Sequence, residues 1–157
     1  MSQTTDDPDY NLWVLLHQVG NAVFKAREKE LLQYGITTME AGALFTIREL
    51  GEKATPAEIA KWMFRATHTI TVLLTRMERK GLIVRVSVKP SGKKNVWQIH
   101  LTEQGKDAYR KSTKRESIKV TVGSLTEQER NQLDLLLRKI REPALQKLVN
   151  EIKPPFP

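Results

Sequence analysis

The chain has 157 residues, no cysteine, and 26 basic against 18 acidic residues, a formal net charge of +8. This length fits one hydrophobic core, and the lack of cysteine excludes disulfides, thiolate metal sites and thiol-based redox sensing. The apolar runs are far shorter than the roughly 20 residues of a bilayer helix, and residues 1–9 carry no signal-peptide pattern. We therefore expect a cytoplasmic protein that does not bind membranes.

The first predicted element is a long amphipathic helix. Residues 10–34 carry apolar side chains at helical spacing, among them Leu16 and Val23. Gly35 follows directly and is typical of a helix end.

Capping boxes predict where later helices begin. In this pattern the side chain of a threonine accepts a hydrogen bond from the backbone amide of the third helical residue. The side chain of a glutamate at that third position accepts in turn from the backbone amide of the threonine. Thr37, Thr55 and Thr126 each begin the pattern. Together with the apolar spacing they predict a helix-turn-helix. Its helices cover residues 38–50, 56–63 and, after a tight connection at 64–66, 67–80.

The periodicity then changes from helical to alternating. Residues 83–88 and 96–101 read as two strands. The segment between them contains Pro90, Gly92 and Asn95, which mark a hairpin tip. A basic β-hairpin after a helix-turn-helix predicts a wing.

The C-terminal third reads mainly as helix. We expect a helix from residue 102 to about 116, whereas residues 117–124 fit either a helix or an extended segment. The last helix, 126–151, carries an apolar stripe that Pro143 should kink or break. Its stripe consists of Leu133, Leu136, Leu137, Ile140, Leu145, Leu148 and Ile152.

Positive charge is concentrated in one segment. Residues 61–94 hold nine basic residues and one acidic residue, so this fifth of the chain carries the whole net charge. Such a patch favours a polyanionic partner. A solvated basic face is the alternative.

The terminal helices, 10–36 and 103–152, are not needed to complete the core of a winged helix-turn-helix at 37–102. Their apolar faces need another surface. A two-fold partner would cover them and present two reading helices to a palindromic site, which predicts a homodimer. The alternative is a monomer in which these helices pack on each other.

Two segments carry a resemblance to a known family. Residues 73–85 read Leu-Leu-Thr-Arg-Met-Glu-Arg-Lys-Gly-Leu-Ile-Val-Arg, and residues 101–105 read Leu-Thr-Glu-Gln-Gly. With the order of elements, these segments resemble the MarR family. The resemblance implies a single mainly α-helical domain over 1–157 with a small β wing, acting as a dimeric transcription regulator on double-stranded DNA. It also implies control, commonly repression, by a small-molecule effector.

The chain departs from the family pattern at two places. Lys93-Lys94 stands where members commonly carry an Asp-Arg pair at the wing tip. Val72 stands where many have an arginine. The binding mode is therefore better supported than any operator sequence.

The predicted reading helix divides into two faces. Ile70, Leu73, Leu74 and Met77 share the face that should pack on the core. Side chains on the first turns of such a helix contact the edges of DNA bases, and basic side chains beside them contact phosphates. Capping or solvent exposure is the alternative for the threonines, and burial under the wing for Val72. The base readers are Thr67, His68, Thr71 and Val72; the phosphate or minor-groove contacts are Arg65, Arg76, Arg79, Lys89, Lys93 and Lys94; Arg85 either joins them or braces the wing.

Family analogy assigns an effector pocket to Trp13, His17, Phe45 and Tyr109, although each also fits an ordinary core. The sequence has no nucleophile motif, phosphate loop or zinc spacing, so we expect no enzyme, cofactor or metal. The competing interpretation is a winged-helix module that binds an acidic protein instead of DNA.

Overall fold

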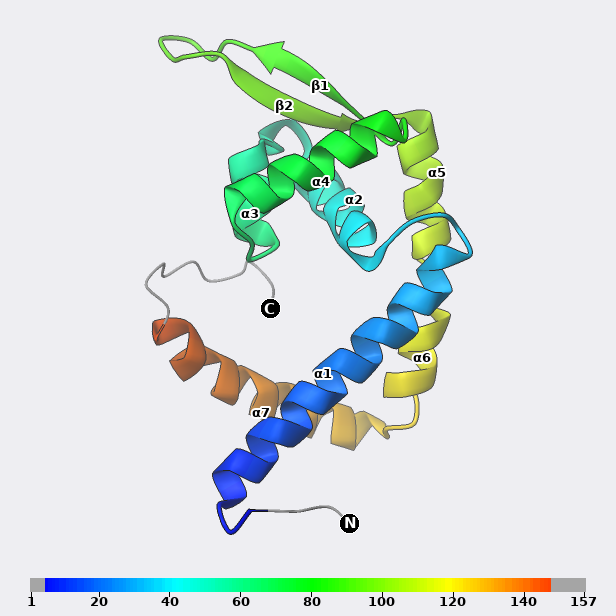
Figure 1. The fold of residues 1–157 in the computed structure, drawn as a ribbon, viewed down its shortest axis with the longest axis vertical. Coiled ribbons are helices and arrows are strands. Elements are labelled where there is room, and N and C mark those ends of the chain that lie inside the picture. Colours follow the sequence, from blue (N-terminus) through cyan, green and yellow to red (C-terminus); the bar gives the residue numbers. More distant parts are fainter. Residues whose placement is uncertain (1–4, 148–157) are drawn as a thin grey trace.

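The computed structural model describes residues 5–147. Figure 1 shows the winged helix-turn-helix and its hairpin at one end of the molecule and the long helices α1 and α7 at the other, connected by α5. The elements are α1 (Pro8–Leu32), α2 (Thr38–Leu50), the 3-10 turn η1 (Gly51–Lys53), α3 (Pro56–Trp62), α4 (Thr67–Arg79), β1 (Ile83–Val88), β2 (Val96–Leu101), α5 (Glu103–Ser112), α6 (Glu116–Val122) and α7 (Glu127–Gln146). The mainly α-helical fold with a small β wing is confirmed.

Two of the three expected capping boxes form completely. Thr37 with Glu40, and Thr126 with Glu129, make both reciprocal hydrogen bonds. Thr55 accepts from the Glu58 amide, but its own amide donates to the Lys53 carbonyl at 2.9 Å. The Glu58 carboxylate therefore has no free donor there and pairs with Lys61 instead. Of the capping box predicted at Thr55, the hydrogen bond to the threonine side chain forms, and the reciprocal bond to the Glu58 side chain does not.

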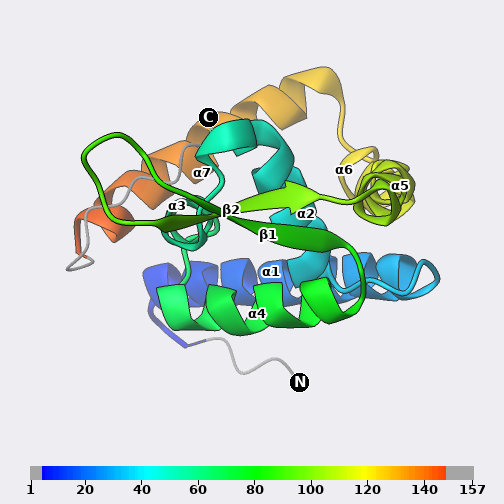
Figure 2. The ribbon, with the colours of Figure 1, turned by 90° about the horizontal axis from the view of Figure 1, so that it is seen from above.

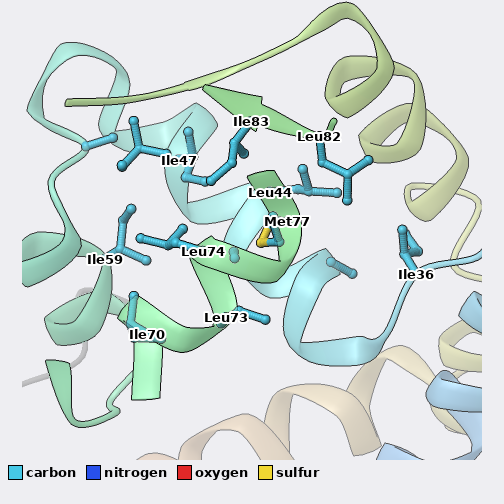
Figure 3. Packing of buried hydrophobic residues seen from close by; sticks show 14 of the residues in the cluster. Ile36, Leu44, Ile47, Ile59, Ile70, Leu73, Leu74, Met77, Leu82 and Ile83 are labelled. Carbon is cyan, nitrogen blue, oxygen red and sulfur yellow. The ribbon is translucent and has the colours of Figure 1, made fainter. Parts of the chain in front are cut away.

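The hydrophobic core lies between α2, α3, α4 and the base of the wing (Figure 3). On α4 the four residues expected to face inward are all buried, because they recur at helical spacing on one side. Leu44 of α2 and Ile59 of α3 pack against them and are fully buried.

The wing is a two-stranded antiparallel sheet in the expected place. Its register pairs Ile83 with Leu101 and Val88 with Val96. The Ile99 amide donates to the carbonyl of Ala54 at 2.8 Å, which joins the hairpin to the segment before α3. The wing is thereby attached at its base and extends beyond the core at its tip (Figure 1).

The two segments that carry the family resemblance meet in space. Thr102 caps α5 by accepting from the Gly105 amide, and its hydroxyl donates to the Gly81 carbonyl. A Cβ atom on Gly105 would lie 1.9 Å from the Leu82 carbonyl oxygen. The glycine allows the first turn of α5 to lie directly on the turn that follows α4.

The region after the wing differs from expectation. Helix α5, which follows the wing, ends at Ser112 instead of near residue 116, and Arg115 adopts a left-handed φ of 54°. A separate helix, α6, follows, so the extended alternative for 117–124 is wrong. The start of α6 is stabilised by Glu30 of α1, which accepts from the first two amides of this helix.

The final helix continues past Pro143 to Gln146, so the proline does not break it. Leu148, Ile152 and the expected helix end at 151 lie outside the described residues. No helix within residues 5–147 is long and apolar enough to cross a membrane.

The apolar faces of α1 and α7 stay exposed in the single chain. Leu16 and Val19 of α1 are 38% and 49% exposed, and Leu136 of α7 is 50% exposed. α7 has no buried residue among those described. The two terminal helices therefore do not cover each other, contrary to the monomeric alternative.

Candidate nucleic-acid interface

The outward face of α4 carries the four expected base readers. Thr67, His68, Thr71 and Val72 are all exposed. Val72 is 61% exposed, so the alternative that the wing buries it is wrong. These residues occupy the first two turns of the helix, on the side away from the core.

Hydrogen bonding limits what Thr71 can offer to a base. Its hydroxyl donates to the Thr67 carbonyl at 3.0 Å. A hydroxyl has one hydrogen and two lone pairs, so the outward side of this oxygen remains an acceptor. An acceptor there fits the exocyclic amino group of adenine or cytosine in a major groove.

Three of the nine lysine and arginine residues between positions 61 and 94 already form ion pairs within the chain. Lys61 pairs with Glu58, Lys80 with Glu40 and Arg85 with Glu78. The remaining six are exposed and have no ion pair with any residue between 5 and 147. Their charges are therefore available to an external anion. They are Arg65, Arg76, Arg79, Lys89, Lys93 and Lys94, the same six that the sequence assigns to phosphates.

Arg85 holds the wing against the reading helix. Its Nε lies 3.2 Å from Glu78, and its Nη2 donates to the Thr75 hydroxyl at 2.8 Å. Both partners belong to α4. Of the two roles left open for Arg85, these contacts favour bracing.

Lys80 has a role that the sequence reasoning missed. Its Nζ lies 2.9 Å from the buried carboxylate of Glu40 and donates to the Gly35 carbonyl at 3.1 Å. The end of α4 is thereby tied to the turn between α1 and α2. A helix-terminal lysine and a capping glutamate are visible in the sequence, but their pairing over 40 positions is not.

A cavity of about 390 Å³ lies beside the reading part, lined by residues of α1 to α3, α5 and the turns that follow α3 and α5. Phe45 and Tyr109, two of the four expected effector residues, line it. Trp13 and His17 do not: they stack on each other, with ring centroids 5.6 Å apart, on the exposed face of α1. The sequence reasoning missed three arginines that also line the cavity, Arg27, Arg65 and Arg115.

Glu30 organises one wall of this cavity. It accepts from the amides of Glu116 and Ser117 at 2.9 and 3.1 Å and pairs with Arg27 at 2.8 Å. Burial alone would raise the pKa of Glu30, but the hydrogen bonds from Ser117, Arg27 and the amides outweigh it and lower this pKa to about 2. Arg27 also donates to the Ser112 carbonyl. One carboxylate thus connects α1 to the break between α5 and α6.

The described part of the chain has no group of three or more His, Asp or Glu side chains arranged to hold a metal ion. His17 and His100 have partners of their own: His17 Nε2 lies 3.1 Å from Asn21, and His100 Nε2 lies 2.9 Å from Gln98.

Sequence comparisons match this chain to regulators. Residues 34–94 match the model of the MarR family. YsmB of Bacillus subtilis (strain 168), described as an uncharacterized HTH-type transcriptional regulator, is 30% identical over 135 residues. That alignment covers 84% of this chain and 85% of YsmB.

Solved structures with the same fold include DNA complexes. The ligand-free, organohalide-sensing regulator RdhR-CbdbA1625 is 25% identical with a TM-score of 0.82, covering 100% of this chain and 97% of its own. The MepR–DNA complex of S. aureus is 25% identical with a TM-score of 0.75 and coverages of 88% and 99%. A mutant of E. coli MarR complexed with operator DNA is 25% identical with a TM-score of 0.73 and coverages of 82% and 92%.

Proposed function

The chain belongs to the MarR family of transcriptional regulators, and from this premise we propose that it is a homodimeric, ligand-responsive repressor that binds a palindromic operator in double-stranded DNA. The main supporting observation is the surface around α4: the outward side chains at its start are accompanied by six exposed cations that have no ion-pair partner within the described residues 5–147. Two relatives of the same fold are complexed with DNA.

The chemistry of the side chains assigns base reading and phosphate binding to two different sets of residues. Thr67, His68, Thr71 and Val72 read base edges, because polar groups and a methyl-bearing side chain at the start of α4 fit the major groove. The six unpaired cations neutralise phosphates or enter the minor groove at the wing. A DNA site with two half-sites requires a second copy of α4, which a two-fold dimer supplies.

The exposed faces of α1 and α7 support the dimer. Leu12, Leu16 and Val19 of α1, with Leu133 and Leu136 of α7, are 38–55% exposed in the single chain. Exposed apolar side chains that recur at helical spacing on both terminal helices are typical of an interface.

The cavity lined by Phe45 and Tyr109 is the proposed effector site. Three arginines and three aromatic side chains, Phe45, Trp62 and Tyr109, favour a planar anion. Arg65 lines this cavity and is also one of the six cations assigned to DNA, so a bound anion would compete with a phosphate for it. Binding there should release DNA.

The test begins with selection of duplexes from a random pool. Binding isotherms for a selected and a random duplex are then measured at several salt concentrations. Replacing Lys93 and Lys94 by alanine should weaken both equally and reduce the slope of log affinity against log salt by roughly 0.9 for each lost phosphate contact. His68→Ala and Thr71→Ala should each weaken the selected duplex by about 1 to 3 kcal/mol and barely affect the random one.

Two results would contradict the proposal. If the pool yields no preferred sequence and affinity for duplex DNA is independent of salt, the winged-helix module for an acidic protein partner is the better interpretation. If the wing variant loses only specificity, the roles of wing and helix are reversed.

The family and the fold are those of transcriptional regulators, which supports a non-catalytic role.

A further inference from the structure

One side of the wing carries an aromatic residue that neither the core nor the bracing contacts use. Residues paired across an antiparallel sheet point to the same side, as do alternate residues along a strand. Trp97 pairs with Ser87 and therefore shares a side with Arg85 and Ile99. Ile99 is fully buried, and Arg85 reaches Glu78 and Thr75 of α4. This is the side of the wing that faces the reading helix.

Toward the tip, the same side is uncovered. Trp97 is 53% exposed, and its indole has no ring contact or hydrogen bond with any residue in the range 5–147. Trp side chains usually bury their ring and satisfy their N–H. A large apolar ring with an unused donor is therefore unexplained by the fold.

The hairpin runs back along α4, so its tip lies on the side of the first turns of that helix in both views (Figures 1 and 2). Arg85 lies beside the last two turns of α4. Trp97 lies further along the hairpin, between the Arg85–Ile99 pair and the lysines of the wing tip, on the side of the wing that faces α4. A duplex with α4 in its major groove and the wing tip in the adjacent minor groove would place the sugar-phosphate backbone that separates the grooves at Trp97.

We infer that Trp97 is a DNA-backbone contact: its indole packs on a deoxyribose between the two grooves, and its N–H donates to the adjacent phosphate oxygen. The inference rests on the proposed DNA binding. A backbone contact positions the protein without reading sequence. Because the indole is uncharged, it displaces no counterion.

The test compares Trp97→Ala with Val86→Ala, a residue on the opposite side of the wing that is 43% exposed. Both are measured against a selected and a random duplex of equal length. Trp97→Ala should weaken both duplexes about tenfold, as expected for a lost hydrogen bond to a charged group. The salt slope should stay at the wild-type value, unlike that of the Lys93/Lys94 variant. Trp97→Phe should lose less, because it keeps a ring against the sugar, and Val86→Ala should bind as wild type.

Fluorescence gives an independent measurement. In a Trp13→Phe/Trp62→Phe variant Trp97 is the one remaining indole, since the chain has three tryptophans. Random duplex DNA should quench its emission. If emission is unchanged at saturating DNA, the contact is absent, whether or not Trp97→Ala folds.

Binding results separate this inference from the proposed function. If the wild-type chain binds no duplex, the proposed function fails. If the wild type binds and folded Trp97→Ala binds equally well, the Trp97 contact alone is wrong. A loss confined to the selected duplex would mean that Trp97 touches bases and would overturn the backbone assignment.

Discussion

Glu30 shows how one residue can define a junction between distant segments. Its carboxylate is buried and replaces water as the acceptor for the free amides at the start of α6. A carboxylate at a helix N-terminus is also favoured by the helix dipole. Because Arg27 lies against the same carboxylate, Glu30 holds both the helix and the arginine of the cavity wall in place.

Acid should weaken the fold through Glu30. The pKa of Glu30 in the folded chain is about 2, below the ordinary glutamate value of 4.5, so between these two pH values the unfolded chain binds more protons than the folded one. The stabilisation is present above pH 4.5 and is lost as the pH falls toward 2, an effect of about 3 kcal/mol. Glu30→Gln should remove this part of the pH dependence and lower the free energy of unfolding at pH 7. Urea denaturation from pH 7 to pH 3 measures both.

Glu103 provides the matched control for that experiment. Its pKa is also lowered, by the hydrogen bond from Lys106, but its side chain is 87% exposed. Solvent screens such pairs, so Glu103→Gln should change stability little. A Glu30→Gln variant that keeps the wild-type acid profile would show that the junction does not depend on this charge.

At the scale of elements, the winged helix is held together by contacts between helix ends and the turns beside them. Lys80 ties the end of α4 to the turn before α2, and Arg85 ties the wing to α4. Gly105 lets α5 begin on the backbone of Leu82. These contacts set the relative orientation of the reading helix, the wing and the arm that leads to α7.

Gly105→Ala should destabilise the protein by about 1 to 3 kcal/mol, since the new methyl group would overlap the Leu82 carbonyl and force a backbone shift. Gly42→Ala is the control, because the new Cβ would meet only the flexible end of Met63 at 3.4 Å. Alanine is also the better helix former, so this control should not lose stability. Thermal unfolding of both variants decides; equal melting temperatures would refute the close-contact argument.

At the scale of the whole molecule, the single chain has a buried core in the winged helix and exposed apolar side chains on α1 and α7, which lie at the opposite end of the molecule (Figure 1). Water-exposed leucine and valine side chains on α1 and α7 favour association, because burying apolar surface is the main driving force for protein contacts. The dimer is therefore expected to be necessary for a stable arrangement of these two helices.

Light scattering at micromolar concentration should give about twice the chain mass of 18.0 kDa. Leu136→Glu on α7 should shift the mass toward that of one chain, because it places a charge in the proposed interface. Val84→Glu, on the exposed outer side of the wing, should remain dimeric. A wild-type mass near 18.0 kDa would contradict the dimer and, with it, the palindromic site.

The sequence by itself determined the local elements. The strands, the ends of α2 and α4, and the buried face of α4 all follow from signals within about four residues, because helix caps and periodic faces are made by near neighbours in the chain. The concentration of charge between residues 61 and 94 was equally visible, since counting needs no coordinates.

Only the tertiary structure decided which groups meet across long separations. It paired Lys80 with Glu40, joined Glu30 to the start of α6, gathered Arg27 with Phe45 and Tyr109, and left Trp13 outside that cavity. The break between α5 and α6 was missed for the same reason, because the carboxylate that accepts from the first amides of α6 lies on α1. Periodicity shows which side of an element is apolar, but the partner of a buried charge depends on how the elements pack, and a cavity exists only where packing leaves space.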